Sequence, residues 1–200
     1  MKLFLNIFIL NCIIFGLDLK NAPLLKNWTI LQEKPVNIKW RDYKGFPISR
    51  AEKIFDHDMI SIAEVIQDID DYPSIFKRVT NSNRLESDIV QIVLDMPFPF
   101  AGRDYIVQYD IEQGSDYWTF SFSSIKHDQG KLKKGNVRLV NAAGVWFLKR
   151  VSKSKTLVKY TWNGELLGNF PNFGLTKAWI AQGNEVLDWL DDAIYKRKKL

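Results

Sequence analysis

The sequence predicts an α+β domain with about nine strands, two short helices after the third strand and one long C-terminal helix. Three observations lead to this class. Residues 28–56 and 79–163 alternate apolar and polar side chains with the period of strands. The segment 59–77 between them changes to the spacing of three and four that is typical of a helix. After Pro171 the pattern stays helical to the end of the chain.

Three short strands open the domain, at residues 28–31, 36–42 and 49–56. In the second of them Val36, Ile38 and Trp40 alternate with polar neighbours. A helix is expected over 59–69, where apolar residues recur every three or four positions after Asp58, a natural N-cap. A shorter helix should follow at 72–77.

Six further strands are expected around 90–94, 105–111, 118–122, 137–141, 145–151 and 157–162, separated by turns rich in Gly and Pro. Because strand side chains alternate between faces, each strand should direct one apolar set inward. With two residues of the last helix, these sets should bind the ligand of an apolar pocket: Val90, Ile92, Tyr105, Val107, Tyr109, Phe120, Phe122, Tyr160, Trp162, Gln182 and Val186. A dense core without a pocket is the alternative that the pattern leaves open.

Composition supports one packed domain over residues 23–200. The chain is 46% hydrophobic and holds seven Trp, seven Tyr and thirteen Phe, too apolar for disorder. Its net charge is +5, but residues 196–199 supply four of the positive charges. Such a run suits the negative end of a helix. The rest of the chain is nearly neutral, so a nucleic-acid partner is not expected.

The first residues predict export. Residues 3–17 form fifteen uncharged, mostly apolar positions after Lys2, the length of a signal-peptide core and too short for a typical membrane span. Residues 1–22 are therefore interpreted as a signal peptide or N-terminal anchor, and the protein as periplasmic or attached to a bacterial envelope. Cleavage, lipidation at Cys12 and retention as an anchor all stay open. Cys12 is the only cysteine, so no disulfide can form within the chain.

Three motifs share their order with a known family. Arg103-Asp104-Tyr105 opens a strand after a Pro-rich turn, Val137-Arg138 opens a later one, and the run 156–171 ends in Gly168 and Pro171 before the last helix. In these features residues 28–196 resemble the StAR-related lipid transfer (START) family, as a bacterial envelope member. The resemblance implies a helix-grip fold, in which a curved antiparallel sheet of about nine strands surrounds the long C-terminal helix and leaves a tunnel for a single lipid. It also implies binding and transfer or sensing of that lipid without catalysis.

One departure from the family bears on the ligand. Sterol-carrying relatives place an acid and an arginine in the tunnel, at positions that correspond here to Val90 and Tyr109. The absence of that pair favours a more apolar ligand, or one held by tyrosine hydroxyls, because an unpaired buried charge is costly. Arg138 is a further candidate for a polar contact in the tunnel, with a surface role as the alternative. Arg103 and Asp104 are expected to form a structural ion pair.

Catalysis is not expected. His57 and His127 lie among charged neighbours at strand ends, and two distant histidines make no metal-ligand signature. No cofactor motif occurs. The alternative is a helix-grip cavity enzyme of the polyketide cyclase or aromatase kind. As a carrier, the protein should be a monomer that contacts a membrane transiently.

A carrier needs a gate, and a polar glycine-centred segment is a candidate. Residues 110–117, with Gly114 and Ser115, join two strands of the expected pocket. The hypothesis places this turn opposite the start of the last helix, where Phe170 and Phe173 would dip into a bilayer. Alternatively, the two phenylalanines attach the helix to the sheet.

Overall fold

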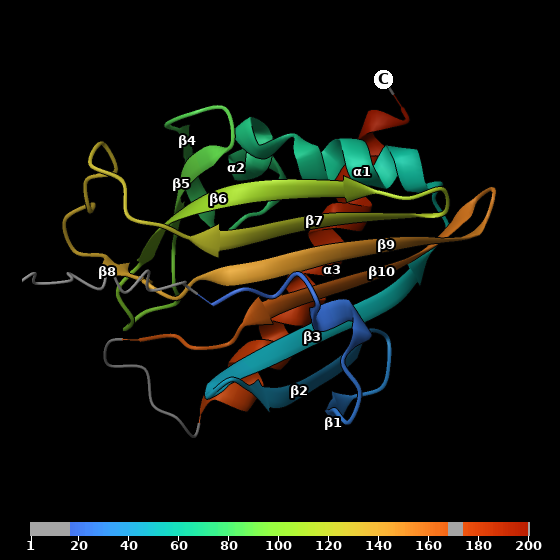
Figure 1. Ribbon diagram of the computed structural model, residues 1–200, viewed down its shortest axis with the longest axis horizontal. Helices are drawn as coiled ribbons and strands as arrows, with labels where there is room; N and C mark the ends of the chain where they lie inside the picture. The colour runs from blue at the N-terminus through green and yellow to red at the C-terminus, as the bar shows by residue number, and fades with distance from the viewer. Residues whose placement is uncertain (1–16, 168–173, 200) are drawn as a thin grey trace, which may run out of the picture.

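The computed structural model describes residues 17–167 and 174–199, and it confirms the expected α+β class (Figure 1). A 3₁₀ turn at Ala22–Leu24 precedes the sheet. The strands are β1 (Thr29–Gln32), β2 (Asn37–Tyr43), β3 (Phe46–Phe55), β4 (Val79–Arg84), β5 (Ile89–Leu94), β6 (Arg103–Gln113), β7 (Tyr117–Ser124), β8 (Val137–Arg138), β9 (Ala143–Ser152) and β10 (Lys155–Asn163). The helices are α1 (Met59–Gln67), α2 (Tyr72–Ile75) and α3 (Leu175–Arg197), with a 3₁₀ turn at Ile69–Asp71 before α2.

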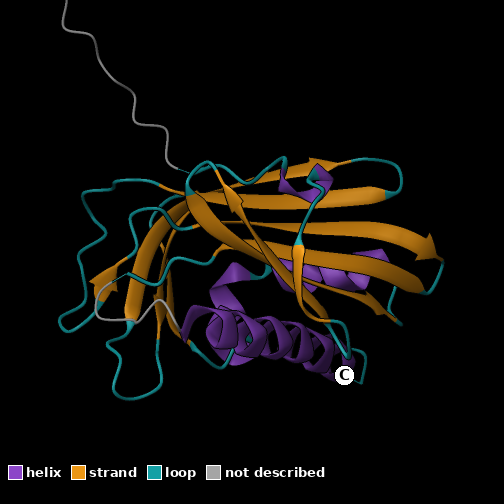
Figure 2. Cartoon of the chain, turned by 90° about the horizontal axis from the view of Figure 1, so that it is seen from below, coloured by secondary structure: helices purple, strands orange, loops and turns teal. Residues whose placement is uncertain are grey.

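Nine strands form one curved antiparallel sheet in the order β1-β2-β3-β10-β9-β7-β6-β5-β4. The pairing of β10 with β3 runs from Thr156 opposite Phe55 to Asn163 opposite Ile48. This long register joins the N-terminal strands to the later meander. Figure 2 shows the sheet curving around α3, which lies on its concave side.

Two elements differ from the expectation. β4 has no counterpart among the expected strands, because its residues, Val-Thr-Asn-Ser-Asn-Arg, are almost all polar. It is an edge strand, in which only Val79 is fully buried, so apolar alternation had no reason to appear. The strand expected at 137–141 is reduced to the two residues of β8, which pair in parallel with the start of β6.

The last helix is buried along one stripe. Trp179, Gly183, Leu187, Leu190 and Ile194 recur every three or four residues and face the sheet. Gly183 allows the helix to approach the sheet closely, since a side-chain Cβ there would lie 3.0 Å from the Ile38 Cδ1 atom. α3 is therefore seated directly on β2 and β3 at this point.

α1 and α2 fill one part of the concave face. Asp58 caps α1 as expected, accepting a hydrogen bond of 2.9 Å from the Ser61 backbone N–H. Ile62 and Ile66 of α1 and Tyr72 of α2 belong to the main hydrophobic core, together with residues of the sheet and α3. The short helices thus pack that region of the sheet solidly and leave the other region, near the start of α3, for a cavity.

The chain before β1 packs against the convex side of the sheet. Leu17, Leu19 and Ala22 are buried with Ile48 and Val145. The folded unit therefore includes residues that precede the expected boundary at 22/23. Residues 1–16, with Cys12, lie outside the described residues, and export, cleavage and anchoring stay predictions. Within 17–167 and 174–199, no helix has the length and apolar character that a membrane span requires.

Candidate functional site

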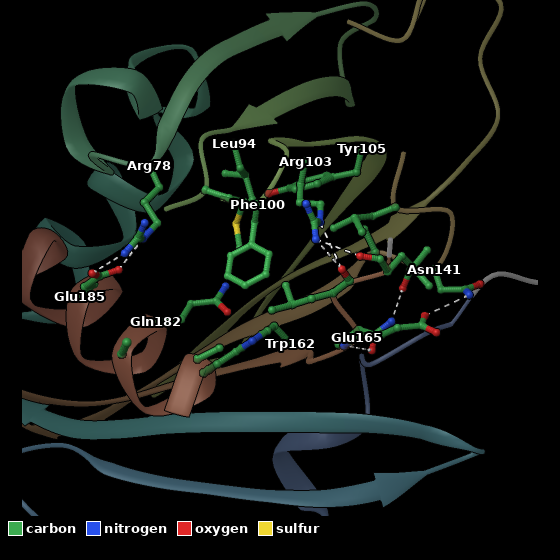
Figure 3. A pocket seen from close by; sticks show the side chains of 18 of the residues that line it. Arg78, Leu94, Phe100, Arg103, Tyr105, Asn141, Trp162, Glu165, Gln182 and Glu185 are labelled. Atoms are coloured by element: carbon green, nitrogen blue, oxygen red, sulfur yellow. Dashed lines mark hydrogen bonds and ion pairs between the residues drawn. The ribbon is translucent and has the colours of Figure 1, made fainter. Parts of the chain in front are cut away.

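A cavity of about 360 Å³ lies between the concave face of the sheet and the first turns of α3 (Figure 3). The loop that joins β5 to β6 covers it, with Met96, Pro97 and Phe100 on its wall. Pro97 and Lys177 line the cavity and are also exposed, so it opens to solvent between this loop and α3. This volume lies within the range of about 300–1,000 Å³ that is usual for small-molecule sites.

Aromatic side chains of the sheet form the wall opposite the loop. Tyr105 of β6 stacks with Phe122 of β7 at a centroid distance of 6.5 Å, and Tyr160 stacks with Trp162 along β10 at 5.1 Å. Tyr160 and Trp162 share one face of β10, as the period of two requires. The indole N–H of Trp162 has no hydrogen-bond partner among the described residues. The wall is thus apolar with a few hydrogen-bonding groups.

A second cavity of about 80 Å³ adjoins the first on its inner side. Tyr105, Phe122, Tyr160 and Gln182 line both, while Tyr109 and Val186 line the smaller one alone. Burial raises the pKa of Tyr105, Tyr109 and Tyr160 above the ordinary phenol value. These groups therefore stay neutral hydroxyls at physiological pH.

An ion pair stands on the wall of both cavities. The Arg78 guanidinium, just before β4, donates two hydrogen bonds of 2.6 and 2.7 Å to the carboxylate of Glu185 on α3. These bonds raise the pKa of Arg78. Val90 and Tyr109 supply no charge pair, yet the cavity has one from other elements. The Arg78–Glu185 pair is about one third exposed, and the sequence did not indicate it.

Arg103 is a second cation on the cavity wall, and it is only 1% exposed. It donates to the backbone carbonyl of Leu166 at 2.7 and 3.2 Å, to that of Leu167 at 2.9 Å, and to that of Ala101. Burial lowers its pKa. One side chain thus ties the β5–β6 loop to the segment that leads to α3, and both segments edge the cavity.

The expected ion pair between Arg103 and Asp104 does not form. Neighbouring residues of a strand point to opposite faces, so Arg103 faces the cavity and Asp104 faces away from it. Asp104 is fully buried, forms an ion pair with Arg138 and accepts a hydrogen bond of 2.6 Å from Gln91. Arg138 also donates to the Gly130 carbonyl at 2.9 Å. Arg138 is therefore not a polar contact in the cavity.

The other predicted binding residues divide into two groups. Tyr105, Phe122, Tyr160, Trp162 and Gln182 line the larger cavity, and Tyr109 and Val186 line the smaller one. The remaining four line neither and are buried in packed clusters: Val90, Ile92, Val107 and Phe120. Three of these four belong to the core that α1 and α2 complete, because the short helices occupy the space above them. Lipid contact by any of these residues stays a prediction.

Several lining residues were not anticipated. They come from the β5–β6 loop, from Glu165–Leu167 and from the outer turns of α3, such as Lys177 and Ala181. The lining residues of α3 recur at a spacing of about four beside the buried stripe, so the helical period of the sequence indicates them. The loop residues have no periodic signal at all.

The expected gate is wrongly placed. Gly114 follows the far end of β6 and pairs with Tyr117 in the β6–β7 turn. Arg103, at the near end of β6, and Gly174, beside α3, both line the cavity. Eleven extended residues separate Gly114 from Arg103, about 35 Å. Gly114 and Ser115 thus cannot close the cavity, whereas the β5–β6 loop edges it. Phe170 and Phe173 lie outside the described residues.

Neither histidine lines either of the two cavities described above. His57 contacts Asp191 at 3.0 Å, and His127 contacts Glu86 at 3.0 Å. Among residues 17–167 and 174–199, no group of three His, Cys, Asp or Glu side chains could hold a metal ion. The cavity wall offers apolar packing, hydroxyl and amide hydrogen bonds, the Arg78–Glu185 pair and the carboxylate of Glu165.

At the level of sequence, no protein-family model and no curated protein matches the chain. Solved structures do. The STAR-related lipid transfer protein of Xanthomonas axonopodis superposes with a TM-score of 0.73 at 18% identity, covering 85% of this chain and 99% of that one. Human STARD10 gives 0.78 at 14% identity, covering 90% and 78%. The chain has the START fold.

A third structure agrees. Human StAR-related lipid transfer protein 5 superposes with a TM-score of 0.74 at 16% identity, covering 86% of this chain and 88% of that one. The START fold accounts for the helix-grip arrangement that the motifs implied, in which a curved sheet encloses the last helix. The cavity lies where these two parts of the START fold meet.

Proposed function

We propose that this protein binds one lipid, or a similarly apolar small molecule, and transfers or senses it without chemistry. The observation that carries the proposal is the cavity of about 360 Å³ between the sheet and α3, walled by aromatic and aliphatic side chains. A core with no function would gain stability by filling such a space. The names of the similar structures, which are lipid transfer proteins, support the same reading.

The ligand should lie with its polar end toward the opening. Lys177 lies on the exposed side of the larger cavity, the Arg78–Glu185 pair borders both cavities, and Tyr109 and Val186 line the inner space. An apolar chain directed inward would bury its surface against aromatic rings. The polar end would then reach the ion pair, Gln182 or the indole N–H of Trp162.

Lipid exchange should use the β5–β6 loop as the contact with a membrane. Phe98 at its tip is 97% exposed and is flanked by Pro97 and Pro99, while Met96 and Phe100 face the cavity. The same short loop thus covers the cavity and presents an aromatic ring to the surroundings. We place the exported monomer in a bacterial envelope on the strength of residues 3–17.

Blocking the cavity tests the carrier function directly. Ala178 on α3 lines the larger cavity, and Ala178→Phe should fill part of it. The full-length protein would be purified and its bound lipids counted by native mass spectrometry and lipid extraction. We expect the wild type to retain one lipid and the variant to lose it. Thr176→Phe, on the exposed face of the same helix, is the matched control and should bind as the wild type does.

A cavity enzyme of the cyclase kind is the competing function. Glu165 is the carboxylate on the wall of the larger cavity that has no ion-pair partner among the described residues, so it is the candidate general acid or base. Glu165→Gln should leave the retained lipid unchanged if the protein is a carrier. A different compound recovered from this variant would instead indicate catalysis, and a wild type that retains no lipid would contradict the carrier proposal.

A further inference from the structure

The loop between β7 and β8, residues 125–136, is strongly cationic. We call it the lysine loop. Lys126, Lys131, Lys133 and Lys134 are all exposed, and none forms an ion pair with another described residue. Asp128 is the one acid within the loop. Elsewhere in the described chain some cations are matched, such as Arg197, which pairs with Asp68, and others, such as Lys149 and Lys153, are not.

The backbone of the lysine loop is held at a fixed place. The Gln91 amide donates to the Lys131 carbonyl at 2.8 Å, and Arg138 donates to the Gly130 carbonyl at 2.9 Å. Both side chains belong to the buried network around Asp104. Gly130 is buried so closely against the sheet that a Cβ atom there would lie 2.0 Å from the Ile106 side chain. The fold thus presents these lysines at a fixed position although their own side chains are free.

The lysine loop ends beside the cavity entrance. The Asn136 backbone N–H donates to the Lys133 carbonyl, and Val137 donates to the Gly102 carbonyl at 2.9 Å. Gly102 ends the β5–β6 loop, and Arg103, which faces the cavity, pairs with Val137. Figure 1 shows the segments that follow β5 and β7 at the same end of the molecule as β8. The C-terminal end of the lysine loop therefore lies beside the end of the loop that carries Phe98.

We propose that the lysine loop and Phe98 form a surface that docks on an anionic lipid bilayer. Four unpaired cations attract the negative surface of such a membrane within about 10 Å. An apolar group accompanies the charge: Leu132 is 52% exposed between Lys131 and Lys133, and Phe98 is 97% exposed. An acidic protein or a nucleic acid would use the lysines but would gain little from a lone protruding phenylalanine. A bilayer interface suits both.

This inference deepens the proposed carrier function by naming the membrane partner, and it requires no assumption about the ligand. The buried network of Asp104, Arg138 and Gln91 would then position the lysine loop for docking rather than contact the lipid. Docking at this surface would set the opening beneath the β5–β6 loop against the membrane from which a lipid leaves.

Vesicle co-sedimentation with the full chain tests the proposal. The probes are vesicles of phosphatidylcholine alone and vesicles that contain about one third phosphatidylglycerol. The variant carries Lys131→Gln, Lys133→Gln and Lys134→Gln. Its matched control carries Lys26→Gln, Lys149→Gln and Lys153→Gln, three exposed lysines outside the loop. The apolar N-terminal residues are the same in all three proteins, so any binding through them cancels in the comparison.

We expect the loop variant to bind anionic vesicles about 100-fold more weakly than the wild type, about fivefold for each lysine, with no change on neutral vesicles. The control should lose much less, and the wild-type preference for anionic vesicles should fall steeply with salt. Thermal unfolding should be equal in all three, since the substituted side chains are exposed. Equal losses in variant and control would overturn the proposal, because they would indicate an effect of net charge.

Two further measurements separate the alternatives. Phe98→Ser should weaken binding to anionic vesicles. The second measurement is binding to soluble polyglutamate. If the wild type binds polyglutamate as tightly as it binds the vesicles, and Phe98→Ser does not change this, the partner is an acidic protein and the proposal of a bilayer is overturned. Lipid retention by the purified loop variant should match the wild type. If the wild type retains no lipid yet docks as expected, the carrier function fails while the docking surface stands.

Discussion

Replacing Arg103 tests the most specific contact of the cavity edge. In Arg103→Met, a side chain of similar length loses every hydrogen bond to the carbonyls of Ala101, Leu166 and Leu167. Hydrogen bonds that involve a charged group contribute about 1.5–3 kcal/mol each. Removing the buried cation also removes its desolvation cost, which the lowered pKa of Arg103 reflects. The net expectation is a loss of about 2–4 kcal/mol in the free energy of unfolding.

Arg103→Lys should recover little of this loss. A lysine ammonium keeps the charge but lacks the planar fork that reaches three carbonyls at once. The β5–β6 loop and the segment before α3 would then separate, so bound lipid should dissociate faster from both variants. Urea denaturation gives the free energy of unfolding, and stopped-flow displacement of a fluorescent fatty acid gives the dissociation rate.

Arg150→Met is the control, because Arg150 is exposed on β9 at the other end of the sheet. It should change the free energy of unfolding by less than about 0.5 kcal/mol. If Arg103→Met costs no more than this control, the guanidinium does not hold the two segments together. If it destabilises the fold but leaves lipid dissociation unchanged, these segments do not control the opening.

Three more predictions concern single side chains. Hydrogen bonds from Ser61 hold the pKa of Asp58 at about 2, below its ordinary 3.8. The unfolded chain therefore binds more protons between these values, so this stabilisation is complete above pH 4 and is lost as the pH falls through 2. Asp58→Ala should cost about 1 kcal/mol in urea denaturation at pH 7 and less near pH 2. Leu187→Ala, in the fully buried stripe of α3, should cost about 2–5 kcal/mol in the same assay. Phe98→Ser should slow lipid transfer between vesicles at unchanged stability, because Phe98 is 97% exposed.

Each of these three substitutions has a control substitution elsewhere in the chain. Asp56→Ala removes a carboxylate that is 82% exposed and should be neutral, and a pH-independent cost of Asp58→Ala would contradict its role as a charged cap. Asp188→Ala on the exposed side of α3 should change stability little, and a similarly small effect of Leu187→Ala would mean that the helix is loosely packed. Ile54→Ser removes an exposed apolar side chain from β3 and should leave lipid transfer unchanged. If Ile54→Ser and Phe98→Ser slow transfer equally, the β5–β6 loop is not a specific membrane contact.

The motif Arg103-Asp104-Tyr105 was only partly predictable from the sequence. The motif was found, and Tyr105 was correctly directed inward by the period of the strand. The same period places Arg103 and Asp104 on opposite faces, so the expected ion pair could have been rejected from the sequence alone. Their true partners could not have been named, because Leu166 is 63 residues away and Arg138 belongs to a separate strand.

The sequence by itself determined the α+β class, the long final helix and the inward faces of β6, β7 and β10, since these depend on periodicity within one segment. Only the tertiary structure decided where a cavity remains. Val90, Ile92 and Phe120 have inward-facing patterns like that of Tyr105, yet α1 and α2 pack over them and the space near Tyr105 stays open. The Arg78–Glu185 pair joins residues 107 apart, and the cavity edge is formed by aperiodic loops. Such contacts depend on how separate elements meet in space, and no local pattern records them.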